Sequence, residues 1–416
     1  MKKYLISLFL VLLFTGVFAQ TQKFIQQRDS LIRAWHVEQQ ASAVKKRKQF
    51  HDLLQKVNRD SAFALNMAQC YFSKMPDIAA FRHIKSIRAS FNNIKRVPAG
   101  QLKSDSLHKV IFSFNQLKKI RFPKNASITS VVLDRNKFKR IPRSLRRLKN
   151  LKTLDINHNH IKRVPRFLRK MDSLQEINLS FNRIKFNTRA VKNLARVKRI
   201  LLAGENLTKL PENIGELKAV RKLNFAKNHL SSVPQTFGNL DSLETLIFYK
   251  NDFDSIPAPV FRLHHLVELD FYYNNLSGIP EAIGRLKNLK QLFLSFNRIE
   301  VLPDSMQQLK QLHYLYIHHN RLRIIPAWIK DFRRLQRLGF GFNQLLFVPG
   351  LSGIKSLREV DLQHNNMSIF PWKLAMKPDL NILILRNNPF ILSVAEKEKL
   401  NKLSKEKRAR GQTLIP

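Results

Sequence analysis

The residues of this chain that could act as nucleophiles or metal ligands are few and scattered. Its single cysteine is Cys70, and its histidines include the adjacent pair His318 and His319 and the more distant His364. A cysteine nucleophile needs a base beside it, and a zinc site needs convergent ligands at motif spacing. Neither arrangement is present, and the sequence has no Gly-rich phosphate loop, nucleophile elbow or zinc helix motif. We therefore expect a protein that is not an enzyme, with no catalytic residues, no metal and no cofactor.

The elements that would position functional side chains come from a repeat. The pattern L-x-x-L-x-L-x-x-N-x-L-x-x-L-P recurs from Ile84 to Phe390, and one clear copy contains Leu289, Asn297 and Pro303. Fourteen copies can be counted, and most of them begin 23 residues apart. Within each copy the apolar residues alternate, as they do in a strand with one buried face. A period of about 20–29 residues is typical of a stacked solenoid.

This pattern resembles the leucine-rich repeat family over about three quarters of the chain. Segments such as Pro211–Leu217 (PENIGEL) and Pro280–Leu286 (PEAIGRL) are similar to the 23-residue class of Ras-suppressor-like and many bacterial members. The resemblance implies an α/β solenoid: a horseshoe with a parallel sheet on its concave face and helical or irregular segments on its convex face. We also expect a ladder of asparagines, because one amide can both donate to and accept from turn backbone groups.

In this family the concave face is the usual ligand surface. Five of the seven tyrosines fall at outward-facing strand positions, whereas the buried positions of the same strands hold Leu, Phe and Ile. Tyrosine is enriched in binding interfaces, although it also favours strands for structural reasons. Nearby carboxylates suit a protein or peptide partner with Lys or Arg, and a glycan is also compatible. The candidate ligand-binding residues are Tyr249, Glu268, Asp270, Tyr272, Tyr273, Phe293, Tyr314, Tyr316 and His318.

Positive charge is concentrated in the first repeats. The formal net charge is +45, and residues 81–196 contain 30 Lys and Arg against 5 Asp and Glu, compared with 25 against 16 in residues 197–390. One flank would therefore attract polyanions, unless the charge is simply a solvated face. Nucleic acid is not expected, because aromatic residues do not alternate with these cations. The candidate anion-binding residues are Lys95, Arg96, Lys118, Lys119, Lys139, Arg140, Lys162 and Arg163.

The two ends of the chain differ from the repeats. Residues 1–19 combine a basic start, a short apolar run and a small residue, Ala19, before the expected cut, which is typical of a signal peptide. The run is short for a membrane anchor, so we expect export to the periplasm, the cell surface or the medium. We predict a helical N-terminal cap at 20–80, the solenoid at 81–390, and a capping helix with a solvated basic tail at 391–416.

Two neighbouring repeats depart from the pattern. The repeat that begins at Leu174 has Phe186 and Asn187 in place of the usual L-P ending, and the next has Glu205 at the ladder position. An ionised Glu cannot donate a hydrogen bond as Asn does. We hypothesise a local irregularity of the solenoid here, between a basic half and an aromatic half.

These observations favour an exported, non-catalytic scaffold that binds a protein or glycan on its concave face. One alternative is a charge-driven binder of anionic envelope or glycan surfaces. Another is a regulator of a small GTPase or phosphatase, by analogy with Ras-suppressor-like proteins, although fold analogy is weak support for a function.

Overall fold

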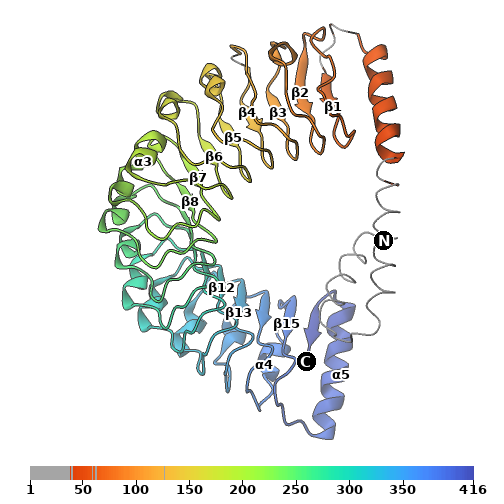
Figure 1. Cartoon of the computed structure of the whole chain (residues 1–416). Coiled ribbons are helices and arrows are strands. Elements are labelled where there is room, and N and C mark those ends of the chain that lie inside the picture. Colours follow the sequence, from red (N-terminus) through yellow and green to blue (C-terminus); the bar gives the residue numbers. More distant parts are fainter. Residues whose placement is uncertain (1–37, 39–40, 59, 61–62, 126) are drawn as a thin grey trace, which may run out of the picture.

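The chain folds as an open horseshoe around a single curved sheet (Figure 1). The computed structural model describes residues 38, 41–58, 60, 63–125 and 127–416. Within these described residues, sixteen strands lie in strict sequence order, and every pair of neighbours is parallel. The predicted α/β solenoid with a parallel sheet is therefore confirmed.

Most strands are only three residues long, so each depends on its neighbours for its hydrogen bonds. Their central residues, such as Leu246, Leu269 and Leu292, are fully buried and form one continuous core. The fourteen predicted repeats supply β2 to β15. The strands are β1 (Phe63–Asn66), β2 (Ile84–Arg88), β3 (Lys109–Ile111), β4 (Ser130–Val132), β5 (Thr153–Asp155), β6 (Glu176–Asn178), β7 (Arg199–Leu201), β8 (Lys222–Asn224), β9 (Thr245–Ile247), β10 (Glu268–Asp270), β11 (Gln291–Phe293), β12 (Tyr314–Tyr316), β13 (Arg337–Gly339), β14 (Glu359–Asp361), β15 (Ile382–Ile384) and β16 (Thr413–Ile415).

Short helical turns cover the convex side. Most follow a proline directly, because its fixed φ suits the start of a helical turn. The 3₁₀ turns are η1 (Ala99–Leu102), η2 (Arg143–Arg147), η3 (Arg166–Lys170), η4 (Glu212–Glu216), η5 (Gln235–Asn239), η6 (Ala258–Arg262), η7 (Glu281–Arg285), η8 (Asp304–Gln308), η9 (Ala327–Asp331) and η10 (Leu351–Gly353). The α-helices of the repeats are α3 (Thr188–Leu194) and α4 (Trp372–Ala375).

The asparagine ladder is formed as expected. Asn251, for example, donates from Nδ2 to the carbonyls of Phe225 (2.9 Å) and Phe248 (3.0 Å), and its Oδ1 accepts from the N–H of Leu230 (3.0 Å). Each amide thus satisfies backbone groups of its own repeat and of the previous one. Thirteen asparagines make these bonds: Asn92, Asn115, Asn136, Asn159, Asn182, Asn228, Asn251, Asn274, Asn297, Asn320, Asn343, Asn365 and Asn388.

Replacing Asn251 with alanine will lower the free energy of unfolding by about 3–5 kcal/mol, because three buried backbone groups lose their partners. Denaturant unfolding measures this change. Asn366→Ala is the matched control, since Asn366 is exposed and has no ladder role. Equal stability of the two variants would contradict a structural role for the ladder.

The sheet begins before residue 81, which is the predicted start of the solenoid. Strand β1 lies within the segment 20–80 and pairs in parallel with β2, so this segment contains a repeat as well as a helix, which spans residues 41–56. Arg47 of this helix donates to the carbonyls of Cys70 and Tyr71, so the basic stretch 45–48 is only partly solvated.

Cys70 is buried, and burial raises the pKa of its thiol. The predicted signal peptide and Leu31, Ile32 and Trp35 of the predicted cap lie outside the described residues.

The C-terminal segment also differs from the prediction of a solvated tail. Helix α5 (Val394–Ala409) begins at a capping box of Ser393 and Glu396, and the chain then returns as strand β16, which pairs with β15. The buried Lys407 ammonium donates to the carbonyl of Lys377 (2.8 Å), which ties α5 to the last repeat. No helix in the described ranges has both the length and the apolar composition of a membrane span.

The hypothesised irregularity of the solenoid between the two halves does not extend to the sheet. Strand β7 pairs in regular register with β6 and β8. The irregularity lies on the convex side, where α3 replaces the usual 3₁₀ turn and Asn187 caps its N-terminus. In the ladder, Glu205 accepts from the N–H groups of Asn182 (2.8 Å) and Ile184 (2.6 Å) but supplies none of the donor bonds that an Asn makes.

Glu205 will make stability depend on pH. Burial raises its pKa from 4.5 to about 7, against the opposing effect of the two N–H donors. The folded chain therefore holds this proton more tightly than the unfolded chain, so the free energy of unfolding falls as pH rises from 4.5 to about 7. We expect Glu205→Asn to restore the ladder, stabilise the protein by about 1–3 kcal/mol above pH 7 and flatten this fall. Unfolding curves across this pH range would contradict the expectation if the variant kept the wild-type slope.

Candidate functional site

Strand register places the predicted concave residues in continuous columns. Glu268 of β10 pairs with Gln291 of β11, which pairs with Tyr314 of β12. A second column runs through Asp270, Phe293 and Tyr316. The sheet thus brings residues that are 23 positions apart in sequence into direct contact.

The aromatic side chains of these columns form one surface. Tyr249 stacks on Tyr272 with ring centroids 5.5 Å apart, and Phe293 stacks on Tyr316 at the same separation. The ring of His318 lies 5.6 Å from that of Tyr272, in an edge-on geometry. We call the nine candidate residues the concave patch, because the structure brings them together as one partly exposed area.

A column of stacked rings borders the concave patch. Tyr273, Phe296, His319, Phe342 and His364 follow one another with centroid separations of 4.1, 3.9, 4.0 and 4.0 Å. All five have positive φ values, which non-glycine residues adopt at an energetic cost. Ring stacking over successive repeats offsets part of that cost. The ring column therefore provides a rigid, flat border to the patch.

Two carboxylates of the patch have no cationic partner among the described residues. Glu268 accepts only a long hydrogen bond from the Thr245 hydroxyl (3.4 Å), and Asp270 accepts from the N–H of Tyr272 (2.8 Å). Burial, with a smaller contribution from the neighbouring Glu268, raises the pKa of Asp270 to about 6. Glu359 differs, since Arg337 pairs with it at 3.1 Å. Within the concave patch, the negative potential available to a ligand therefore comes from Glu268 and Asp270.

Burial favours the neutral imidazole form of His318 and His319 on the concave face. Burial lowers the pKa of His318 to about 4, and His319 beside it contributes in the same direction. Burial also lowers the pKa of His319. Within the described part of the chain, His, Cys, Asp and Glu nowhere gather in a group of three or more that could hold a metal. The histidines act as flat, polar rings beside the tyrosines.

Gly339 is a concave residue that the sequence analysis missed. It lies beside Tyr316 in the sheet, and an added Cβ there would approach the Tyr316 ring to 2.7 Å. The glycine thus lets the tyrosine lie flat over the next strand. The sequence could have pointed to Gly339, because it is a glycine at an outward-facing strand position in a chain that has only 12 glycines.

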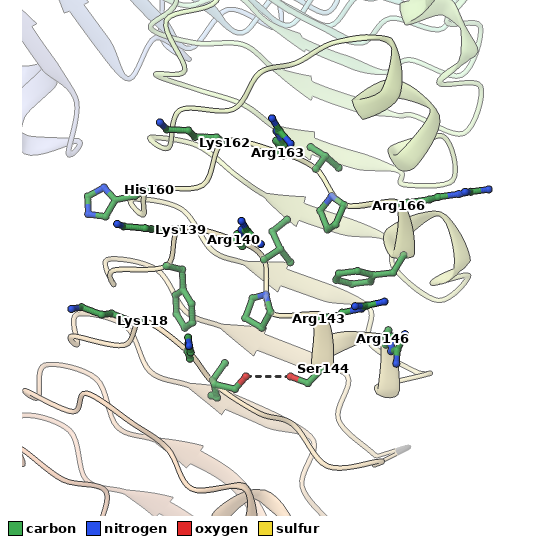
Figure 2. A pocket seen from close by; sticks show the side chains of 18 of the residues that line it. Lys118, Lys139, Arg140, Arg143, Ser144, Arg146, His160, Lys162, Arg163 and Arg166 are labelled. Atoms are coloured by element: carbon green, nitrogen blue, oxygen red, sulfur yellow. Dashed lines mark hydrogen bonds between the residues drawn. The ribbon is translucent and has the colours of Figure 1, made fainter.

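The predicted basic flank is a broad groove beside the first repeats. Figure 2 shows Lys118, Lys139 and Lys162 in one row, with Arg140 and Arg163 in a second row. Sixteen of the thirty lining residues are Lys or Arg and none is Asp or Glu, so the potential is positive throughout. We call this region, which encloses about 2780 Å³, the basic groove. All the predicted flank residues line it except Lys95.

The floor of the basic groove is apolar. Val97, Ile141 and Val164 are buried side chains that line it, together with Pro98, Pro142 and Pro165. None of the ion pairs between described residues involves a cation of the groove. These cations are therefore free to contact an anionic ligand.

The sequence analysis missed the outer wall of this groove. Arg143 and Arg146 come from η2 and Arg166 from η3, and Figure 2 shows them opposite the lysine row. Ser144 ties η2 to the floor, because its hydroxyl donates to the carbonyl of Ile120 (3.2 Å) and accepts from the N–H of Phe122 (3.1 Å). The residue that follows the repeat proline is Arg in two adjacent copies, Arg143 and Arg166, and this pattern could have predicted the wall.

Comparison with known proteins agrees with this geometry. The leucine-rich repeat pattern matches residues 126–184, and that of a leucine-rich repeat region matches residues 258–376. This chain is a leucine-rich repeat protein. A leucine-rich repeat protein of Leptospira interrogans shares its fold with a TM-score of 0.74 at 22% identity, over 86% of this chain and 96% of that one.

Two further solved structures share the leucine-rich repeat fold. The plant peptide hormone receptor RGFR1, solved with RGF2, aligns with a TM-score of 0.55 at 25% identity, over 74% of this chain and 56% of the receptor chain. An internalin of Listeria monocytogenes aligns with a TM-score of 0.57 at 20% identity, over 77% of this chain and 85% of the internalin. At these identities the likeness concerns the fold.

Proposed function

We propose that this leucine-rich repeat protein is an exported, non-catalytic scaffold that recognises a protein or peptide on its concave patch. The observation that carries the proposal is the patch itself: stacked, partly exposed tyrosines next to two carboxylates without cationic partners. Tyrosine supplies stiff contact area at low entropic cost, and uncompensated carboxylates select Lys or Arg. The peptide bound by the plant receptor RGFR1 is a precedent for this use of the fold.

Affinity capture tests this proposal. The protein is immobilised and exposed to envelope and medium fractions at low and at high salt. A partner held by aromatic contacts stays bound at high salt, because apolar burial is not screened. Capture that is restricted to low salt would contradict the concave-patch proposal.

A second function is favoured by the basic groove. Sixteen Lys and Arg side chains line it, with no Asp or Glu among the described lining residues, and they would hold an anionic ligand such as a phospholipid headgroup, lipopolysaccharide or an anionic glycan. Binding of this kind weakens steeply as salt rises. A soluble sulfated glycan such as heparin is a convenient probe of the groove.

A further inference from the structure

The flank that carries the basic groove changes character along the horseshoe. The position four residues after the ladder residue holds Arg96, Lys119, Arg140 and Arg163 in the first repeats. The same position holds Ser232, Ser255 and Gly278 in the middle, and Val301, Ile324, Phe347 and Ile369 near the C-terminal end. Because equivalent positions of a solenoid lie on the same side, one flank is basic at one end and apolar at the other.

The apolar end is exposed. The four side chains, which we call the apolar row, are 70% (Val301), 56% (Ile324), 50% (Phe347) and 75% (Ile369) exposed. Single exposed apolar residues are normal, but a row across four consecutive repeats is a contiguous patch of the kind that marks an interaction surface. Leu346 and Ile391 extend it, at 54% and 82% exposed.

We infer that this flank docks onto an anionic lipid bilayer. The apolar row would enter the boundary between headgroups and acyl chains, while the basic groove holds lipid phosphates. Proteins that lie on membranes combine these two features, apolar side chains for insertion and Lys or Arg for anionic lipids. The inference rests in part on the second proposed function, the anion binding of the groove.

The charge of the chain favours a bilayer over a second copy as the occupant. Two copies that met along this flank would bring together surfaces of a chain with a net charge of +45, and like charges oppose association. An anionic bilayer instead attracts the basic end of the flank. This attraction lowers the free energy needed to bring the apolar row into contact with the bilayer. The row and the groove then act on the same partner.

Co-sedimentation with vesicles of equal parts phosphatidylcholine and phosphatidylglycerol tests the inference. The full chain is compared with Ile324→Ser/Phe347→Ser/Ile369→Ser, which alters only exposed side chains. We expect vesicle partitioning to fall about tenfold or more, because three apolar side chains no longer insert. Heparin binding should be unchanged, since the groove is intact. The control Val44→Gln removes a side chain of similar exposure (65%) from the N-terminal helix and should leave vesicle binding as it is.

A position-specific readout excludes binding through other parts of the chain. An environment-sensitive dye on Ile369→Cys, in a Cys70→Ala background, should shift to the blue on addition of vesicles, whereas the dye on Val44→Cys should not. Wild-type partitioning of the triple variant, or an unshifted dye at position 369, overturns the inference. Loss of a dimer in sedimentation of the triple variant would assign the row to self-association instead. Unchanged heparin binding after reversal of groove charges would refute the second proposed function separately.

Discussion

Replacing Tyr272 and Tyr316 together with alanine will weaken binding of a concave-face partner about a thousandfold or more. Buried tyrosines at the centre of an interface each contribute about 2 kcal/mol or more, and the two residues belong to different stacked pairs, with Tyr249 and Phe293. The melting temperature should change by only a few degrees, because both side chains are partly exposed and the buried strand residues are kept. Titration of a captured partner measures the change.

Tyr71→Ala is the matched control for this variant. Tyr71 is a partly exposed tyrosine (36%) that lies in the N-terminal repeat, outside the concave patch. It should leave partner binding unchanged. If the double variant bound as tightly as the wild type, the concave patch would not be the binding site.

Reversing Lys119, Arg140 and Arg163 to glutamate will weaken binding of heparin about a hundredfold or more at physiological salt. Each cation near an anionic surface contributes about 1 kcal/mol, and reversal adds repulsion to the loss. The three residues are exposed and form no ion pair among the described residues, so the fold should be retained. Isothermal titration at two salt concentrations measures both the affinity and its salt dependence.

Lys287→Glu/Lys310→Glu/Lys330→Glu is the control for net charge, since it changes the total charge by the same amount at exposed sites outside the groove. It should reduce heparin binding only slightly. Equal losses in the two variants would show that total charge, not the groove, holds the anion.

The repeat made much of this structure predictable. A fixed residue at each position of a 23-residue period specifies the same contact in every copy, so β2 to β15 and the asparagine ladder follow from the sequence. The basic row was also predictable, because Lys118, Lys139 and Lys162 occupy equivalent positions. The nine residues of the concave patch lie together for the same reason, while their role in binding remains a prediction.

The features that sequence reasoning missed depend on contacts between segments that the period does not describe. Strands β1 and β16 lack the repeat pattern, and only their pairing with β2 and β15 defines them. Arg143 and Arg166 line the groove because of how η2 and η3 fold back after their prolines. The sheet is regular at Glu205 because its carboxylate still accepts hydrogen bonds from two backbone N–H groups, as a ladder asparagine does. It lacks only the bonds that the asparagine would donate.

We expect this one-sided ladder position to divide the protein into two cooperative folding units. Glu205 lacks the donor bonds that tie a ladder residue to the previous repeat, and α3 interrupts the run of 3₁₀ turns on the convex side at the same place. In a solenoid, stability is approximately the sum of repeat terms and nearest-neighbour terms, so a weak neighbour term lets one side open while the other persists. Under mechanical load or mild denaturant, we expect the horseshoe to separate first at this junction, with the basic groove on one unit and the concave patch on the other.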